Sequence, residues 1–155
     1  MSKFNEQIKA FNTMYGMPAP QVPVISRVTF PDRLDLVGRL AKFKLILLEE
    51  LDEVHELQVS INSGASEIEV LTELADWLGD LQVYCASEMA KFGLDNDIVL
   101  GIIMESNMSK LGPDGKPIYD ERGKVMKGPG YWKPEPTIKA WIERSMNSST
   151  AGERK

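Results

Sequence analysis

The chain has 155 residues, of which 43% are hydrophobic and 26% are charged, as in an ordinary globular domain with a core of its own. Its net charge of −5 argues against nonspecific binding to nucleic acid or to anionic membranes. The single cysteine excludes an intrachain disulfide, and the sequence contains neither a signal peptide nor an apolar run of transmembrane length. We therefore expect one cytoplasmic domain over residues 1–155.

The first predicted element is a short amphipathic helix, because four apolar residues recur at helical spacing before a glycine (Phe4, Ile8, Phe11 and Tyr15, then Gly16). Three prolines in residues 17–23 predict an extended connector. Residues 29–32 predict the start of a second helix, with Pro31 in its first turn.

This second helix is predicted to run to about residue 59, and it carries carboxylates in an unusual place. The positions three, four and seven residues from Glu50 include five apolar side chains (Phe43, Ile46, Leu47, Val54 and Leu57). Glu50 therefore lies inside the stripe that should face the core. Glu53 lies one turn further on and Glu49 lies at the edge of the stripe, whereas Asp52 and Glu56 point to solvent. Buried carboxylates are normally paired or bound to metal.

A third helix brings a second acidic cluster. Ser66–Glu69 forms a capping box that opens this helix, which is predicted to end near Gly93. Glu73, Asp76 and Asp80 follow i, i+3, i+7 spacing along the edge of its apolar side. Trp77 and Tyr84 on the same helix are expected in the core or in a subunit interface.

The segment between these two helices, residues 60–65, is rich in turn residues and too short for anything but an antiparallel hairpin. A fold point between residues 62 and 63 places Glu53 beside Glu73, each about 15 Å from the turn at a rise of about 1.5 Å per residue. Glu50 pairs with Asp76 one turn further along. The sequence thus predicts four carboxylates in a groove between two helices.

The remaining chain is predicted to contain two more helices separated by a non-helical segment. A further helix starts after Asp95 or Asp97 and runs to about Lys110, and a last short helix covers residues 137–146. Between them, residues 111–136 are too rich in glycine and proline for a helix and contain a predicted small β-hairpin. The predicted fold class is therefore an all-α antiparallel helix bundle, with its core at about residues 30–110, a non-helical arm at 111–136 and a disordered tail at 147–155.

Charge is uneven along the chain, since residues 110–133 contain six basic and three acidic residues and the rest of the chain is acidic. Carboxylates without histidine or thiolate are hard oxygen ligands that suit Mg²⁺ or Mn²⁺. Such ions can also bind substrate phosphates, while a spare carboxylate orients or deprotonates water. No P-loop, Gly-x-Ser-x-Gly or Rossmann fingerprint is present. A di-iron bundle would need two Glu-x-x-His units, and His55 is the only histidine.

Several motifs carry a resemblance to a known superfamily. Glu50-x-x-Glu53 followed by Glu73-x-x-Asp76 resembles the ExxE…ExxD signature of the all-α nucleoside triphosphate pyrophosphohydrolases, which include MazG-like proteins, dimeric dUTPases and phosphoribosyl-ATP pyrophosphohydrolase. Asn107-x-x-Lys110 looks like the element after the third helix of MazG-like members. Residues 123–129 resemble the C-terminal arm of a MazG-like, phosphoribosyl-ATP-pyrophosphohydrolase-like subgroup.

The resemblance implies a hydrolase that cleaves a nucleotide between its α- and β-phosphates, giving a monophosphate and pyrophosphate. It implies Mg²⁺, with Mn²⁺ as a substitute, held by four carboxylates (Glu50, Glu53, Glu73 and Asp76). The implied catalytic residues are Glu50 and Glu49, the latter as an extra ligand or as the base that activates water. Four residues would bind the substrate (Asn107, Lys110, Lys124 and Lys127). The implied assembly is a homodimer or homotetramer with sites near subunit interfaces.

Two alternatives stay open. The nucleotide could be phosphoribosyl-ATP rather than a nucleoside triphosphate. The chain could also be a non-catalytic helical module whose acidic groove binds a cation or a basic partner. Nothing in the sequence selects a base or a sugar.

Overall fold

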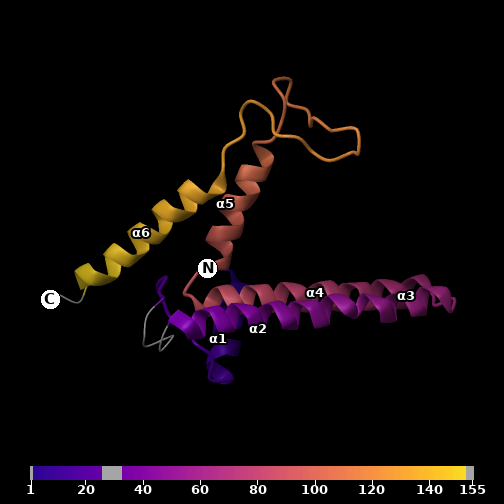
Figure 1. Ribbon diagram of the computed structural model, residues 1–155, viewed down its shortest axis with the longest axis horizontal. Coiled ribbons are helices and arrows are strands. Elements are labelled where there is room, and N and C mark those ends of the chain that lie inside the picture. Colours follow the sequence, from indigo (N-terminus) through magenta and orange to yellow (C-terminus); the bar gives the residue numbers. More distant parts are fainter. Residues whose placement is uncertain (1, 26–32, 153–155) are drawn as a thin grey trace.

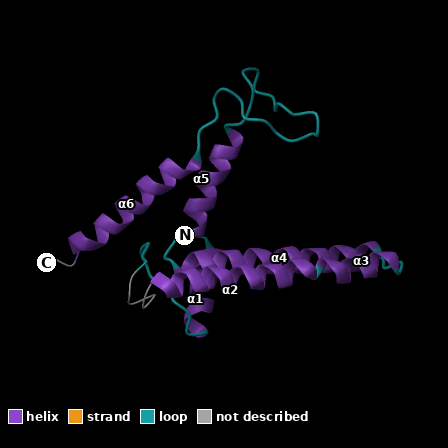
Figure 2. Ribbon diagram, in the orientation of Figure 1, coloured by secondary structure: helices purple, strands orange, loops and turns teal. Residues whose placement is uncertain are grey.

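The protein is seen in a computed structural model that describes residues 2–25 and 33–152. Within these ranges the chain forms helices joined by turns and one long arm (Figures 1 and 2), which confirms the predicted all-α class. The helices are α1 (Lys3–Met14), α2 (Arg33–Asp52), α3 (Val54–Asn62), α4 (Glu67–Lys91), α5 (Asn96–Met108) and α6 (Pro134–Gly152). The helix start predicted at residues 29–32 lies outside the described residues.

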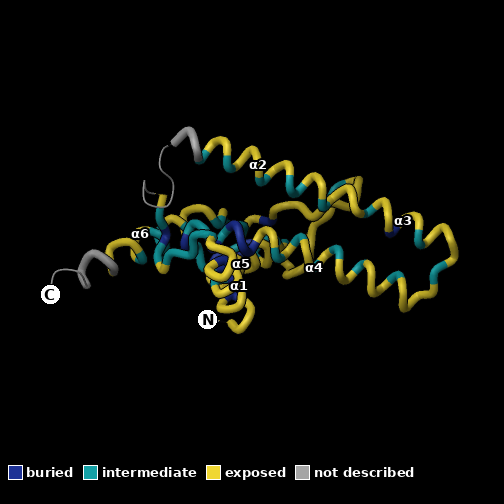
Figure 3. Tube along the Cα trace, turned by 90° about the horizontal axis from the view of Figure 1, so that it is seen from below, coloured by how far each residue is buried: buried dark blue, intermediate teal, exposed yellow. Residues whose placement is uncertain are grey.

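The buried core lies where α1 meets α4 and the start of α5 (Figure 3). Ile8 of α1 packs against Ala86 and Ala90 of α4. Beside this contact, Ser87 Oγ donates a hydrogen bond of 2.6 Å to Asn12 Oδ1, and Asn12 Nδ2 donates one of 3.0 Å to the Ser87 carbonyl. Both residues are buried, so α1 is held to α4 by a satisfied polar pair as well as by apolar packing.

A second polar contact fixes α1 to the start of α5. Asn96 Nδ2 donates to Asn5 Oδ1 at 3.1 Å, and Asn5 Nδ2 donates to Asp95 Oδ2 at 3.0 Å. Asp95 is also the N-cap of α5, where its side chain accepts from the Ile98 amide. These bonds set the direction in which α5 leaves the end of α4, and α5 in turn carries the arm.

The layer formed by α2, α3 and α4 is the predicted hairpin. The capping box at Ser66 is present, with hydrogen bonds in both directions between Ser66 and Glu69, and α4 packs along α2 and α3. The prediction of one continuous helix to residue 59 is wrong, because the helix is interrupted at Glu53 and resumes as α3 to Asn62. At the other end of the layer, Arg39 of α2 forms a 3.0 Å ion pair with the buried carboxylate of Glu88 on α4.

The arm follows the end of α5 that lies away from the α2–α4 layer (Figure 1). The predicted β-hairpin is reduced to an isolated antiparallel bridge between Tyr119 and Val125, and no strand forms among the described residues. The arm's base is fixed to α5, since the Gly128 amide donates to the Lys110 carbonyl at 3.0 Å. A Cβ atom at Gly128 would collide with the Leu111 carbonyl oxygen, which explains why glycine stands there.

The last helix, α6, packs against α5 and is longer than predicted. Disorder was expected from residue 147, and that expectation is wrong as far as Gly152, where α6 ends. The serine-rich sequence has low helix propensity. However, the hydroxyls of Ser145 and Ser148 donate to the carbonyls of Trp141 and Arg144, four residues earlier, at 2.9 Å each, so these side chains bond within the helix instead of competing with it.

Candidate metal and phosphate site between α3 and α4

An acidic groove lies between the α2–α3 junction and α4. Its volume is about 230 Å³, and it is lined by four carboxylates and two apolar side chains (Glu53, Glu56, Glu73, Asp76, Leu57 and Trp77). Three of the four predicted metal ligands therefore share one groove. Glu50, the fourth, lies one turn before Glu53 and is half-buried, whereas Glu49 beside it is exposed. Glu56, which was expected to face solvent only, also lines the groove.

The register of the two helices differs from the predicted one. Glu73 Oε1 accepts a 3.0 Å hydrogen bond from Ser60 Oγ of α3, so Glu73 reaches further toward the tip than the expected position beside Glu53. The difference has a simple cause: α3 continues to Asn62, and the turn therefore begins later than residue 60.

Mutual repulsion among the carboxylates acts on Glu53. Although Glu53 is exposed, the pKa of its carboxyl is raised above its ordinary value, first by the charge of Glu50, then by partial desolvation, and then by the charges of Glu56, Asp80 and Asp76. These causes come from both sides of the groove, so Glu53 lies where the two predicted acidic clusters meet. An opposite charge bound there would reverse this effect.

Two aromatic residues of α4 reach Glu50. Trp77 Nε1 donates a 2.8 Å hydrogen bond to the Glu50 carbonyl. A hydrogen bond with the Glu50 carboxylate is the largest cause that raises the pKa of the Tyr84 phenol. Both rings were expected in the core or in an interface, and their contact with Glu50 was not predicted. Their spacing of seven residues on one helix face was the available signal.

The groove suits a divalent cation by its donor chemistry, since carboxylate oxygens are the ligands that Mg²⁺ and Mn²⁺ prefer. In the part of the chain that the structure describes, however, no set of three Asp, Glu, His or Cys side chains is close enough together to hold a metal ion. The carboxylates thus share a groove without forming a finished coordination shell. Holding an ion would require side-chain rotations, for instance of Glu73 away from Ser60.

The charged side chains around the groove are almost all acidic. Residues 49–80 contain ten acidic residues and no lysine or arginine (Glu49, Glu50, Asp52, Glu53, Glu56, Glu67, Glu69, Glu73, Asp76 and Asp80). A segment of charge −10, with half of its acidic residues in or beside one groove, attracts cations strongly.

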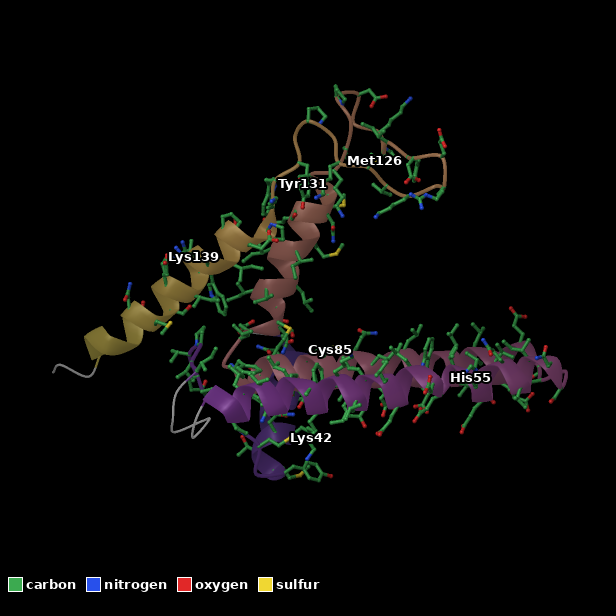
Figure 4. All side chains as sticks on the ribbon, viewed as in Figure 1. Lys42, His55, Cys85, Met126, Tyr131 and Lys139 are labelled. Atoms are coloured by element: carbon green, nitrogen blue, oxygen red, sulfur yellow. The ribbon has the colours of Figure 1, made fainter. Side chains whose placement is uncertain are left out.

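The predicted substrate-binding residues lie elsewhere. Lys110 Nζ donates to Asn107 Oδ1 at 2.7 Å at the end of α5, and Lys127 Nζ lies 4.6 Å from the centre of the Tyr131 ring on the arm. Figure 4 shows the arm, marked by Met126 and Tyr131, well separated from α3, marked by His55. None of the four residues, including Lys124, lines the acidic groove. One chain alone does not bring the two halves of the predicted site together.

No helix in the described ranges is long and apolar enough to cross a bilayer. Comparison with protein-family profiles gives no match, and comparison with curated proteins gives none either. Among solved structures, a candidate NTP pyrophosphohydrolase from Exiguobacterium sp. 255-15 matches with a TM-score of 0.54 and 24% identity, over 96% of this chain and 98% of the other. At this identity the likeness concerns the fold, so the chain has the all-α architecture of that protein.

Proposed function

We propose that the protein is a Mg²⁺-dependent nucleotide pyrophosphohydrolase, which hydrolyses a nucleoside triphosphate between the α- and β-phosphates to a monophosphate and pyrophosphate. The observation that carries the proposal is the acidic groove, which is lined by Glu53 of the α2–α3 junction together with Glu73 and Asp76 of α4. Support comes from the shared fold with a candidate NTP pyrophosphohydrolase. The MazG-like or phosphoribosyl-ATP-pyrophosphohydrolase-like character of the chain is part of this proposal.

Four carboxylates would hold the metal, with Mn²⁺ as a substitute for Mg²⁺ (Glu50, Glu53, Glu73 and Asp76). The bound ion would supply positive charge that offsets the charge of the phosphates. Glu49 is exposed next to Glu50, and one of these two carboxylates would accept the proton of the attacking water. The groove has no histidine or lysine, so only carboxylates are available there for proton transfer.

The phosphate-binding side would come from a second copy of the chain. Asn107 and Lys110 at the end of α5, with Lys124 and Lys127 on the arm, form a basic region that one chain keeps away from its own groove. A homodimer or homotetramer could place this region on the groove of a neighbouring subunit. Exposed apolar side chains beside the groove support self-association, among them Ile68 at 77% and Leu71 at 55% exposure.

A non-catalytic module that binds a cation or a basic partner is the alternative, and the ten acidic residues without lysine or arginine over residues 49–80 would serve such a module equally well. Turnover separates the two. We expect Mg²⁺-dependent release of pyrophosphate from at least one member of a panel of ribo- and deoxyribonucleoside triphosphates that includes phosphoribosyl-ATP.

The same assay tests the site. Glu50→Gln should lower turnover by at least about tenfold to a hundredfold, the range seen even when groups that only support metal ligands are removed. Asp52→Asn is the matched control, because Asp52 is on the same turn but exposed and outside the groove lining. If wild type hydrolyses a nucleotide and Glu50→Gln does so at the same rate, the metal-site assignment is wrong. If wild type hydrolyses no nucleotide of the panel, the non-catalytic module is favoured.

A further inference from the structure

The interruption between α2 and α3 has no local cause in the sequence. The chain from Leu47 to Leu57 contains neither glycine nor proline and is rich in strong helix formers. Glu53 keeps helical dihedral angles of −60° and −19°, and the Glu56 amide donates to the Glu53 carbonyl at 3.0 Å, three residues back. The backbone therefore tightens by one 3₁₀-type turn at Glu53, a residue of the acidic groove.

A side chain from α4 supplies the missing cause. Glu50 lies in the last turn of α2 and Val54 is the first residue of α3, so the Glu50 carbonyl and the Val54 amide both stand outside the i→i+4 bonds of their own helices. The indole Nε1 of Trp77 donates to that Glu50 carbonyl at 2.8 Å. A side chain that inserts into the backbone ladder is one of the known causes of a helix kink.

The break affects where the carboxylates point. Successive residues turn by about 100° in an α-helix and by about 120° in a 3₁₀ turn. A 3₁₀ turn at Glu53 therefore rotates Glu53 and Glu56 around the helix axis relative to Glu50. Glu53 and Glu56 line the groove, and Trp77 lines it with them. The same indole thus contacts the groove and the backbone that orients its ligands.

We propose that Trp77 is a positioning residue, whose indole N–H holds the α2–α3 break open and thereby sets the rotation of Glu53 relative to Glu50, two of the carboxylates proposed to hold the metal. The inference rests on the proposed metal site, and it assigns Trp77 no contact with the metal or the substrate. Without the N–H, the Val54 amide can close onto the Glu50 carbonyl, α2 and α3 become one continuous helix, and Glu53 turns relative to Glu50.

The test replaces the indole by rings that lack the donor. Trp77→Phe keeps an aromatic ring in the same place, and replacement of Trp77 by β-(3-benzothienyl)alanine keeps the bicyclic shape in case the smaller ring disturbs folding. Trp141→Phe is the matched control, because Trp141 is half-buried on α6 and distant from the groove. Circular dichroism checks that each variant is folded.

Two measurements avoid reliance on turnover. The first is the dissociation constant for Mn²⁺ alone, from the electron paramagnetic resonance signal of the free ion. The second is amide hydrogen exchange at Val54. We expect both Trp77 variants to bind Mn²⁺ about tenfold to a hundredfold more weakly than wild type, as for other residues that orient metal ligands. Exchange at Val54 should become slower, and the Trp141→Phe control should leave both quantities unchanged.

The possible failures are distinguishable. If both Trp77 variants bind Mn²⁺ as tightly as wild type and show the same amide exchange at Val54, the role of Trp77 is overturned and the metal site stands. Weaker binding with unchanged Val54 exchange would also overturn it, because the effect would then come from packing and not from the helix break. If wild type itself binds no Mn²⁺ at millimolar concentration, the metal site and this inference fall together.

Discussion

A bound divalent cation should stabilise this protein, because the groove concentrates charge of one sign that the ion offsets. An ion that binds only the folded state stabilises it by about 2.7 kcal/mol at a hundred times its dissociation constant. For a domain of this size, each kcal/mol raises the melting temperature by about 2–4 °C. We therefore predict that saturating Mg²⁺ raises the melting temperature by about 5–11 °C over protein in EDTA.

A single substitution should show where this effect originates. Glu53→Gln removes the carboxylate on which the repulsion converges, so the metal-free variant should melt at a higher temperature than metal-free wild type at pH 7. The sign follows from the raised pKa of Glu53. Folding favours the protonated form of Glu53. The loss of folding stability caused by its ionisation therefore appears as the pH rises through the raised pKa, and it is absent below the ordinary pKa of 4.5. The advantage of Glu53→Gln should therefore disappear in acid.

The assay is thermal melting by circular dichroism, with and without Mg²⁺, at constant ionic strength set by NaCl so that screening does not mimic binding. Asp52→Asn serves as the control for loss of a negative charge on the same helix. Two results would refute the reasoning. One is a wild-type melting temperature that does not change with millimolar Mg²⁺ when nucleotide is present. The other is an Mg²⁺-dependent rise in melting temperature that is as large in Glu53→Gln as in wild type.

Three further predictions concern the frame that carries the site. Asn12→Leu should cost about 1–3 kcal/mol in urea unfolding, because it leaves the buried Ser87 hydroxyl without its acceptor and removes the side-chain bond to the Ser87 carbonyl. Thr13→Ala, which removes an exposed hydrogen bond, should cost much less. Ser66→Ala should cost about 1 kcal/mol by loss of the α4 cap. The destabilisation caused by Ser66→Ala should shrink in acid, because hydrogen bonds from Ser66 lower the pKa of Glu69. The stability that ionised Glu69 contributes is present above the ordinary carboxyl pKa of 4.5 and is lost as the pH falls through the lowered pKa. Gly128→Ala should detach the arm from α5, seen as faster exchange of the Gly128-position amide, while the melting temperature of the α2–α4 layer stays near that of wild type.

Local patterns were sufficient to predict the parts of the fold that local forces determine. The capping box at Ser66 and the apolar stripe around Glu50 located the hairpin and the face that carries the carboxylates. The groove between Glu53, Glu73 and Asp76 follows from that hairpin. These features depend on residues three or four apart on one helix, which is the range over which periodicity is informative.

The remaining features depend on partners distant in sequence. The helix break at Glu53 lies where the Trp77 indole of α4 donates a hydrogen bond to the Glu50 carbonyl, and no residue near Glu53 in the sequence predicts a break there. The buried pair of Asn12 and Ser87 joins residues 75 positions apart, and both residue types are usually found at the surface. The separation of Lys124 and Lys127 from the groove depends on the direction in which α5 leaves α4, which the contact between Asn5 and Asn96 sets.

The central claim is that this groove directs hydrolysis between the α- and β-phosphates, and product analysis in ¹⁸O-labelled water tests it most directly. With Mg²⁺ and an accepted nucleoside triphosphate, wild type should form monophosphate and pyrophosphate in equal amounts, with one ¹⁸O atom in one of the two products. Glu50→Gln should form little of either, and Asp52→Asn should match wild type. Formation of diphosphate and inorganic phosphate, or product formation that survives both Glu50→Gln and Asp76→Asn, would contradict the account.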